Sequence, residues 1–206
     1  MLPRHTFLGS AVRAEAPDGQ VEEWLGRSHE PVVYVSLGSF LSARSDLLAT
    51  IVQALGPLDV RVALAHGSTP RALLGPLPEW WLVREMLPQV TLLRYACVAV
   101  SHGGNNSITE SLTAGVPLLL LPLSTDQFAG AAAVEDRRLG EVLDPTRADA
   151  VAIRSAAERL MGSADVVDRA GLHRLGASLR DSPGPRRARH ALTPQTAAEA
   201  SAPATA

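Results

Sequence analysis

The sequence predicts a doubly wound α/β domain built on a parallel sheet, as in Rossmann-like folds. Short apolar runs alternate with segments whose apolar residues recur at helical spacing. The runs are apolar on both faces, which is typical of parallel strands covered by helices on each side. Glycine and proline mark many of the boundaries between these segments.

The elements follow one another in regular order from residue 31. Residues 32–38 (VVYVSLG) form a β-branched run that ends in glycine, which indicates a buried strand. Residues 45–55 have helical spacing and stop at Gly56-Pro57. The later expected elements are strands at 60–65 and 82–87, a short helix at 89–95, a strand at 97–101, a helix at 104–114 closed by Gly115, a strand at 116–121, a helix at 126–138, a strand at 141–143, helices at 148–161 and 166–179, and one more short helix after residue 181.

This pattern divides the chain into one domain and two flanking segments. Residues 1–30 have mixed composition and are interpreted as a lead-in similar to an interdomain linker. Residues 31–192 carry the α/β pattern. Residues 193–206 are rich in Ala, Thr and Pro, and we expect a disordered tail there.

Composition excludes several classes of protein. The 206 residues hold 19 basic and 21 acidic side chains, a net charge of −2, whereas nucleic-acid and membrane-surface binders carry a basic excess. The longest apolar run, residues 116–123, is far shorter than the roughly 18 residues of a membrane span. The lone Cys97 permits neither an internal disulfide nor a cysteine zinc cluster, and no other ligand spacing indicates a metal. We therefore expect a cytoplasmic protein without a metal site.

Small polar residues follow three of the predicted strands. They lie at 36–39 (SLGS), 101–107 (SHGGNNS) and 124–127 (STDQ). Ligands of open α/β sheets bind at the carboxyl ends of the strands, so we expect these segments to line one crevice.

The segment after the fourth strand carries the most chemistry. The glycines at 103–104 let a backbone approach a ligand, and the helix that follows offers unpaired N–H groups to an anion. His102 can donate to the same anion, and Asn106 and Ser107 fall in the first helical turn. Glu110 shares their face and can accept from a ribose diol. A phosphate site followed by a ribose site indicates a nucleotide. A simple turn followed by helix-cap residues accounts for the same residues about equally well.

Several segments in order resemble the donor-binding signature of the UDP-glycosyltransferases. They are LPQ at 87–89, HGGNNSITE at 102–110, AGVPLLLLP at 114–122 and TDQ at 125–127, with SLGSF at 36–40 as a further match. The resemblance runs from about residue 32 to residue 161. That family has the GT-B fold, inverts the anomeric centre and includes plant secondary-metabolite and bacterial macrolide glycosyltransferases. The resemblance implies that this chain is the C-terminal, donor-binding half of a GT-B enzyme.

The resemblance also implies a role for individual residues. Ser39, His102 and Gly104 would contact the diphosphate, Asn106 and Ser107 the phosphate nearer the nucleoside, Gln89 and Glu110 the ribose, Met86 and Leu87 the base, and Asp126 and Gln127 the sugar hydroxyls. The donor would be a UDP-sugar or a TDP-sugar, with no cofactor and no metal. Met86 and Asn105 stand where the plant enzymes have tryptophan, which leaves the choice between uracil and thymine open.

The acceptor-binding half of such an enzyme has no counterpart here. Its catalytic histidine, which activates the acceptor hydroxyl, is expected in a missing N-terminal domain or a separate subunit, so no catalytic base is assigned in this chain. Two other interpretations stay open. One is a non-catalytic subunit that binds sugar nucleotides, and the other is half of a different GT-B enzyme such as a sugar-nucleotide epimerase.

Overall fold

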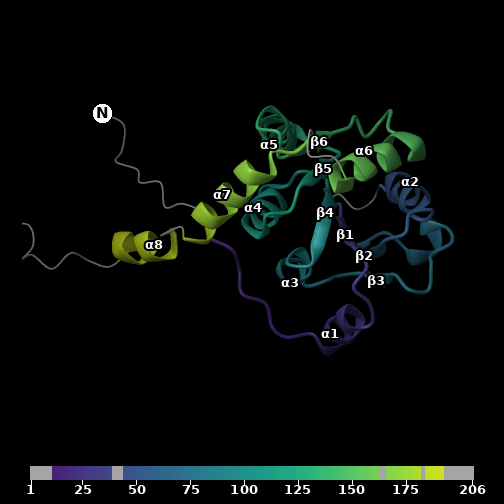
Figure 1. The fold of residues 1–206 in the computed structure, drawn as a ribbon, viewed down its shortest axis with the longest axis horizontal. Helices are drawn as coiled ribbons and strands as arrows, with labels where there is room; N and C mark the ends of the chain where they lie inside the picture. Colours follow the sequence, from purple (N-terminus) through teal and green to yellow (C-terminus); the bar gives the residue numbers. More distant parts are fainter. Residues whose placement is uncertain (1–10, 39–43, 163–165, 182–183, 193–206) are drawn as a thin grey trace, which may run out of the picture.

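A parallel sheet lies at the centre of the computed structural model, which describes residues 11–38, 44–162, 166–181 and 184–192 (Figure 1). Within these residues the sheet has six strands in the order β3-β2-β1-β4-β5-β6. The strands are β1 (Val32–Ser36), β2 (Arg61–Ala65), β3 (Leu82–Arg84), β4 (Ala96–Ser101), β5 (Leu118–Leu120) and β6 (Gly140–Val142). The helices are α1 (Gly19–Gly26), α2 (Ser45–Leu55), the short 3₁₀ helix η1 (Arg71–Leu74), α3 (Gln89–Leu93), α4 (Asn105–Ala114), α5 (Thr125–Asp136), α6 (Ala150–Gly162), α7 (Arg169–Arg180) and α8 (Gly184–Leu192).

This arrangement confirms the doubly wound α/β prediction. From β1 the chain moves outward to β3, then crosses to β4 beside β1 and moves outward to β6. Helix α2 packs on α6, whereas α4 packs on α3 and α7 on the other side of the sheet (Figure 1). The direction of winding therefore reverses between β1 and β4, which is where doubly wound folds open a ligand crevice.

Burial explains why these segments form strands. All residues of β2 and β5 are buried, as are Val32 to Val35 of β1. Such strands need helices on both faces, and the flanking helices provide them. Helix α2 has the predicted bounds, and its buried residues include Leu48, Ile51 and Leu55, which share one face.

Four strands are shorter than predicted, namely those expected at 32–38, 60–65, 82–87 and 116–121, and the largest differences are in the third and the fifth. The third strand was expected to reach residue 87, but β3 ends at Arg84, which pairs with the last residue of β2, Ala65. Just beyond this pair, the N–H groups of His66 and Gly67 still donate to the carbonyls of Arg84 and Glu85. The fifth was expected from residue 116, but β5 begins at Leu118, directly after a proline that has no N–H to donate.

The segment before β1 packs against the domain. Val21 and Trp24 of α1 are buried. The guanidinium of Arg61 lies 3.9 Å from the centroid of the Trp24 ring, and the indole N–H donates to the carbonyl of Trp80 at 2.8 Å. Residues of the expected lead-in thus contribute to the core of the sheet domain.

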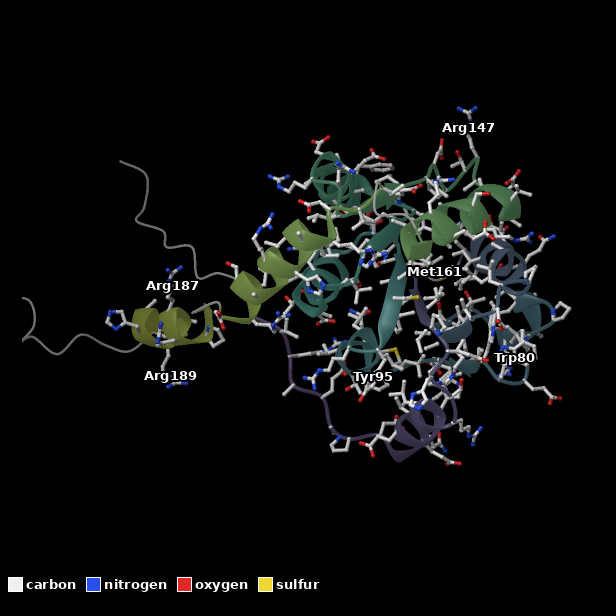
Figure 2. All side chains as sticks on the ribbon, in the orientation of Figure 1. Trp80, Tyr95, Arg147, Met161, Arg187 and Arg189 are labelled. Atoms are coloured by element: carbon white, nitrogen blue, oxygen red, sulfur yellow. The ribbon has the colours of Figure 1, made fainter. Side chains whose placement is uncertain are left out.

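The C-terminal helices lie beside α4 and beyond it. Helix α7 packs on α4, and α8 extends away from the sheet with Arg187 and Arg189 pointing to opposite sides (Figure 2). Among the described residues, no helix combines the length and the apolar character needed to cross a membrane.

Candidate functional site

The three polar strand ends singled out in the sequence lie side by side. Ser36 at the end of β1 pairs with Ser101 at the end of β4, and Ser101 pairs with Leu120 at the end of β5. The loops that follow these strands therefore leave the sheet at the same edge, as expected. Ser39, predicted to contact the diphosphate, lies outside the described residues.

The imidazole of His102 lies between two glycines from different loops. A Cβ placed on Gly38 would be 2.8 Å from Cε1 of His102, and one placed on Gly104 would be 2.6 Å from Nε2. At either distance a Cβ could be accommodated only if the His102 ring shifted. Gly38 also has φ +80, a conformation that favours glycine. These glycines thus make room for the His102 ring at the crevice between β1 and β4.

Burial and neighbouring groups have opposing effects on His102. Desolvation lowers the pKa of the imidazole below its ordinary value, while the charge of Asp126 and a hydrogen bond to the backbone of Ser36 raise it. With burial as the largest cause, the ring is neutral at pH 7. A neutral ring that donates its one N–H to the Ser36 carbonyl keeps an acceptor nitrogen, and it gains a second donor only when it is protonated.

Helix α4 begins beside this ring. Gly104 is its N-cap and provides no side-chain hydrogen bond to the first turn. The N–H groups of that turn are accordingly available to an anion, and the helix dipole favours negative charge there. Asn106 is exposed and Ser107 is half-buried in the same turn.

A cavity of roughly 170 Å³ opens next to the helix start. Five of the predicted site residues line it, namely Met86, Leu87, Gln89, Asn106 and Ser107. Gly38, which contacts His102, lines it as well, so the cavity adjoins the imidazole. The other described site residues, namely His102, Gly104, Glu110, Asp126 and Gln127, stand outside this lining.

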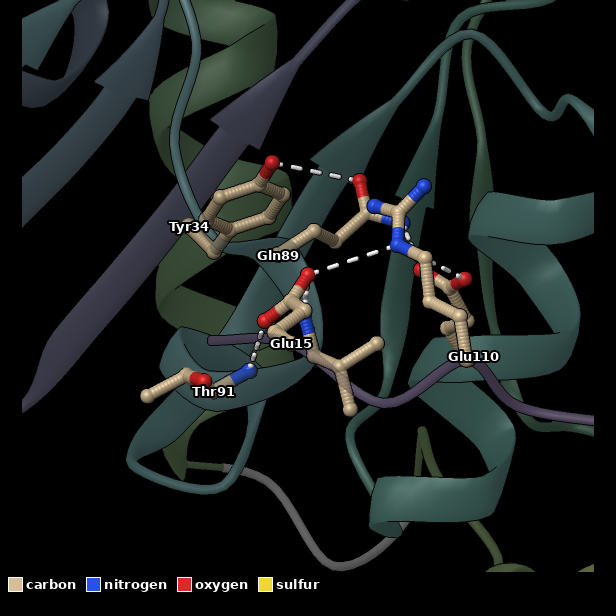
Figure 3. A network of polar contacts seen from close by, with 7 residues as sticks. Glu15, Tyr34, Gln89, Thr91 and Glu110 are labelled. Carbon is tan, nitrogen blue, oxygen red and sulfur yellow. Dashed lines mark hydrogen bonds and ion pairs between the residues drawn. The ribbon is translucent and has the colours of Figure 1, made fainter. Parts of the chain in front are cut away.

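A chain of buried hydrogen bonds joins the cavity to Glu110 (Figure 3). The Tyr34 hydroxyl donates to Oε1 of Gln89 at 3.1 Å, and Nε2 of Gln89 donates to Oε2 of Glu110 at 2.5 Å. Burial raises the pKa of Tyr34 above its usual range, so its hydroxyl stays a donor at neutral pH. The predicted ribose pair is therefore brought together, and Tyr34 orients it.

Two further residues of this network were missed in the sequence. Nε of Arg13 lies 3.7 Å from Oε1 of Glu110 and 3.4 Å from Oε1 of Glu15. The Glu15 carboxylate in turn accepts from the backbone N–H groups of Val90 and Thr91 at 3.1 and 2.8 Å (Figure 3). Nothing in the mixed composition of the lead-in indicated these contacts.

The predicted sugar-binding pair occupies the start of α5. Gln127 is buried, and its Oε1 accepts from the N–H groups of Leu123 and Ser124 at 2.8 and 3.1 Å, completing a capping box. Asp126 is exposed and accepts a hydrogen bond of 3.3 Å from the Ser124 hydroxyl. The Ser-x-x-Gln spacing was the signal for this structural role of Gln127. In the part of the chain that the structure describes, no group of His, Cys, Asp and Glu side chains could hold a metal ion.

Comparison with known proteins gives consistent matches. The model of the UDP-glucoronosyl and UDP-glucosyl transferase family matches residues 1–166. The NDP-glycosyltransferase YjiC of Bacillus licheniformis is 29% identical over 168 residues, which cover 81% of this chain and 42% of the relative. The demethyllactenocin mycarosyltransferase of Streptomyces fradiae is 31% identical over 185 residues, 89% of this chain and 37% of the relative. The crystal structure of the calicheamicin glycosyltransferase CalG4 superimposes with a TM-score of 0.72 and 32% identity, covering 79% of this chain and 42% of that one. The chain thus spans less than half the length of each of these proteins.

Proposed function

This chain belongs to the UDP-glucoronosyl and UDP-glucosyl transferase family, and from that premise we propose that it is the donor-binding half of an inverting, metal-independent glycosyltransferase. Its donor would be a UDP-sugar or TDP-sugar carrying a hexose or deoxyhexose. The acceptor would be a hydroxyl group of a small molecule. Two of the relatives are named as a demethyllactenocin mycarosyltransferase and a calicheamicin glycosyltransferase. These names support a natural product as the acceptor.

One observation carries this proposal. The His102 ring is held between Gly38 and Gly104 at the point where the sheet reverses its winding, beside the uncapped start of α4. An imidazole and a helix N-terminus in one crevice suit a diphosphate. The adjoining cavity, with Gln89 in its wall, has the position expected for the nucleoside.

The proposed reaction follows from where negative charge develops. The acceptor oxygen forms a bond to the anomeric carbon while the bond from that carbon to the diphosphate oxygen breaks, and the electron pair leaves with the nucleoside diphosphate. The N–H groups of α4 would stabilise that charge, together with the His102 ring, which would become protonated because the bound diphosphate raises its pKa. The proton of the acceptor hydroxyl would pass to a base outside this chain. Asp126, exposed at the start of α5, would accept hydrogen bonds from the sugar.

We further propose that transfer needs a second half that binds the acceptor. The chain covers 42% of the YjiC relative and 37% of the mycarosyltransferase, which supports a division of the binding surfaces between two halves. That half would be either an N-terminal domain or a separate subunit.

Calorimetric titration tests the nucleotide site directly. UDP, TDP and GDP, together with UDP-glucose and TDP-glucose, are titrated into the purified chain with and without EDTA. We expect UDP or TDP to bind in preference to GDP, and EDTA to leave the affinity unchanged. Absence of binding by every nucleotide at millimolar concentration would refute the proposed function, and loss of binding in EDTA would refute metal independence.

A further inference from the structure

Arg13 stands at the ribose end of the proposed site, although it precedes the first helix of the domain. It lines the cavity together with Gln89, Asn106 and Ser107. It also borders a neighbouring groove that is lined by Glu110. The Arg13 side chain is therefore placed between the cavity and the buried carboxylate.

Glu15 fixes this position. Its carboxylate accepts two hydrogen bonds from the first turn of α3, from Val90 and Thr91, and it pairs with Nε of Arg13 at 3.4 Å (Figure 3). Because Gln89 belongs to the same helix, Arg13 and Gln89 are held in one local framework.

The terminal nitrogens of the Arg13 guanidinium, Nη1 and Nη2, are available to another partner. The closest contacts of the guanidinium with Glu15 and with Glu110 both run through Nε, and within the described residues neither Nη1 nor Nη2 makes a hydrogen bond. The Arg13 side chain is 55% exposed, whereas that of Glu110 is 6% exposed. A planar fork with two unused donor nitrogens thus lies at the cavity wall.

The charges around Arg13 indicate which group it binds. The carboxylates of Glu15 and Glu110 both pair with its Nε, and Glu85 lines the same cavity. Arg94 and Arg180, by contrast, line the neighbouring groove and not the cavity. A group bound to Arg13 in the cavity therefore approaches these carboxylates as well. A phosphate would be repelled here, whereas a neutral hydroxyl can accept from arginine and donate to a carboxylate.

We propose that Arg13 is a further binding residue for the nucleotide and that its terminal nitrogens donate to the ribose hydroxyl oxygens. Glu110 and Gln89 accept the hydrogens of the same hydroxyls. The inference rests on the proposed function, since it assigns a residue to the ribose of the nucleotide donor. The donor site is then completed by a segment that lies outside the strand and helix pattern of the sheet.

The test compares two nucleotides that differ only at the ribose. UDP or TDP, whichever the wild-type chain binds more tightly, and its 2′,3′-dideoxy analogue are titrated into the wild type, R13A and R13K. We expect R13A to weaken the hydroxyl-bearing nucleotide about tenfold and to leave the dideoxy analogue within about twofold of wild type. R13K, which keeps the charge but has a different donor geometry, is expected to recover part of the loss.

R27A is the matched control, because Arg27 is similarly exposed and, as the C-cap of α1, pairs with Glu23 of that helix. It is expected to leave both affinities unchanged.

Equal weakening of both nucleotides by R13A would assign Arg13 to the base, the phosphates or the fold. No weakening would remove Arg13 from the site, so either result overturns the inference. If R13A has no effect while H102A still weakens binding, only this inference fails. If the wild type binds no nucleotide, the proposed function fails and the inference falls with it.

Discussion

The two ends of the proposed nucleotide site are held in different ways. At the diphosphate end, the His102 ring lies against the backbone of Gly38 and Gly104, where a Cβ would come within 2.8 and 2.6 Å of ring atoms. At the ribose end, Gln89 and Glu110 are held by a chain of side-chain contacts.

The position of the His102 ring is set by steric exclusion, whereas the positions of Gln89 and Glu110 are set by a network of side-chain contacts. A ring between two backbones has one position, so a single added methyl group displaces it. A network distributes its restraint over several hydrogen bonds, each of which contributes about 1 kcal/mol. Changes at the diphosphate end should therefore have larger effects than changes at the ribose end.

Gly104→Ala should produce the largest effect. The new methyl group would lie 2.6 Å from Nε2 of His102, and the ring must leave its position. We expect nucleotide binding to weaken by about 2–4 kcal/mol, measured by calorimetry, because the donor is lost and the displaced ring blocks the crevice. Gly26→Ala is the matched control, since nothing lies within 4 Å of a Cβ at that position.

The double variant Gly104→Ala/His102→Ala separates this mechanism from damage to α4. If the methyl group acts through the ring, the double variant binds nucleotide no more weakly than His102→Ala alone. Full additivity of the two losses would show that the glycine serves another purpose.

His102→Ala should have the next largest effect, about 1.5–3 kcal/mol on nucleotide binding, the value of a charge-assisted hydrogen bond. Burial lowers the pKa of this ring in the free protein, whereas a bound diphosphate would raise it. Affinity should therefore be highest at low pH and fall as the pH rises through the pKa of the bound state. UDP-glucose is the suitable ligand, because its diphosphate does not titrate near neutral pH. A wild-type pH profile that parallels that of His102→Ala would contradict the assignment.

The fold was accessible from the sequence because local patterns determine it. The alternation of apolar strands and helices predicted the doubly wound sheet, and the helix at residues 45–55 has the expected bounds. The strand ends at Ser36 and Ser101 could be placed together because parallel strands share an edge. The residues from 102 to 110 could be found because a strand exit, a glycine pair and a helix start are adjacent along the chain.

Contacts across long sequence distances could not be predicted. Tyr34 and Gln89 are 55 positions apart, and Glu15 meets Thr91 across 76 positions, so neither pair leaves a local pattern. The role of Gly38 depends on the ring of His102 in the loop after β4, which no turn signal reveals. Gln127 was assigned to the sugar through the resemblance alone, and its role in the capping box, for which Ser-x-x-Gln spacing is a signal, was not predicted.

Asp126→Ala should have a smaller and more selective effect. The side chain is exposed and its contact with the Ser124 hydroxyl is 3.3 Å long, so little of the fold depends on it. We expect UDP-glucose or TDP-glucose to bind about 1 kcal/mol more weakly, with the corresponding free diphosphate nearly unaffected. Calorimetry with both ligands measures the difference, and equal losses would exclude a role in holding the sugar.

Tyr34→Phe should have the smallest effect on binding, and it bears directly on the comparison of the two ends. It removes the hydroxyl that donates to Gln89 at 3.1 Å and leaves the 2.5 Å contact between Gln89 and Glu110 in place. The free energy of unfolding should fall by about 1 kcal/mol, because one buried amide oxygen loses its donor. Nucleotide affinity should change by less than about 0.5 kcal/mol, because the remaining contacts still hold the amide. Chemical denaturation and calorimetry on the same preparation separate the two quantities. A loss of affinity as large as that of His102→Ala would mean that the ribose end is also held at a single point, and the distinction between the two ends would no longer stand.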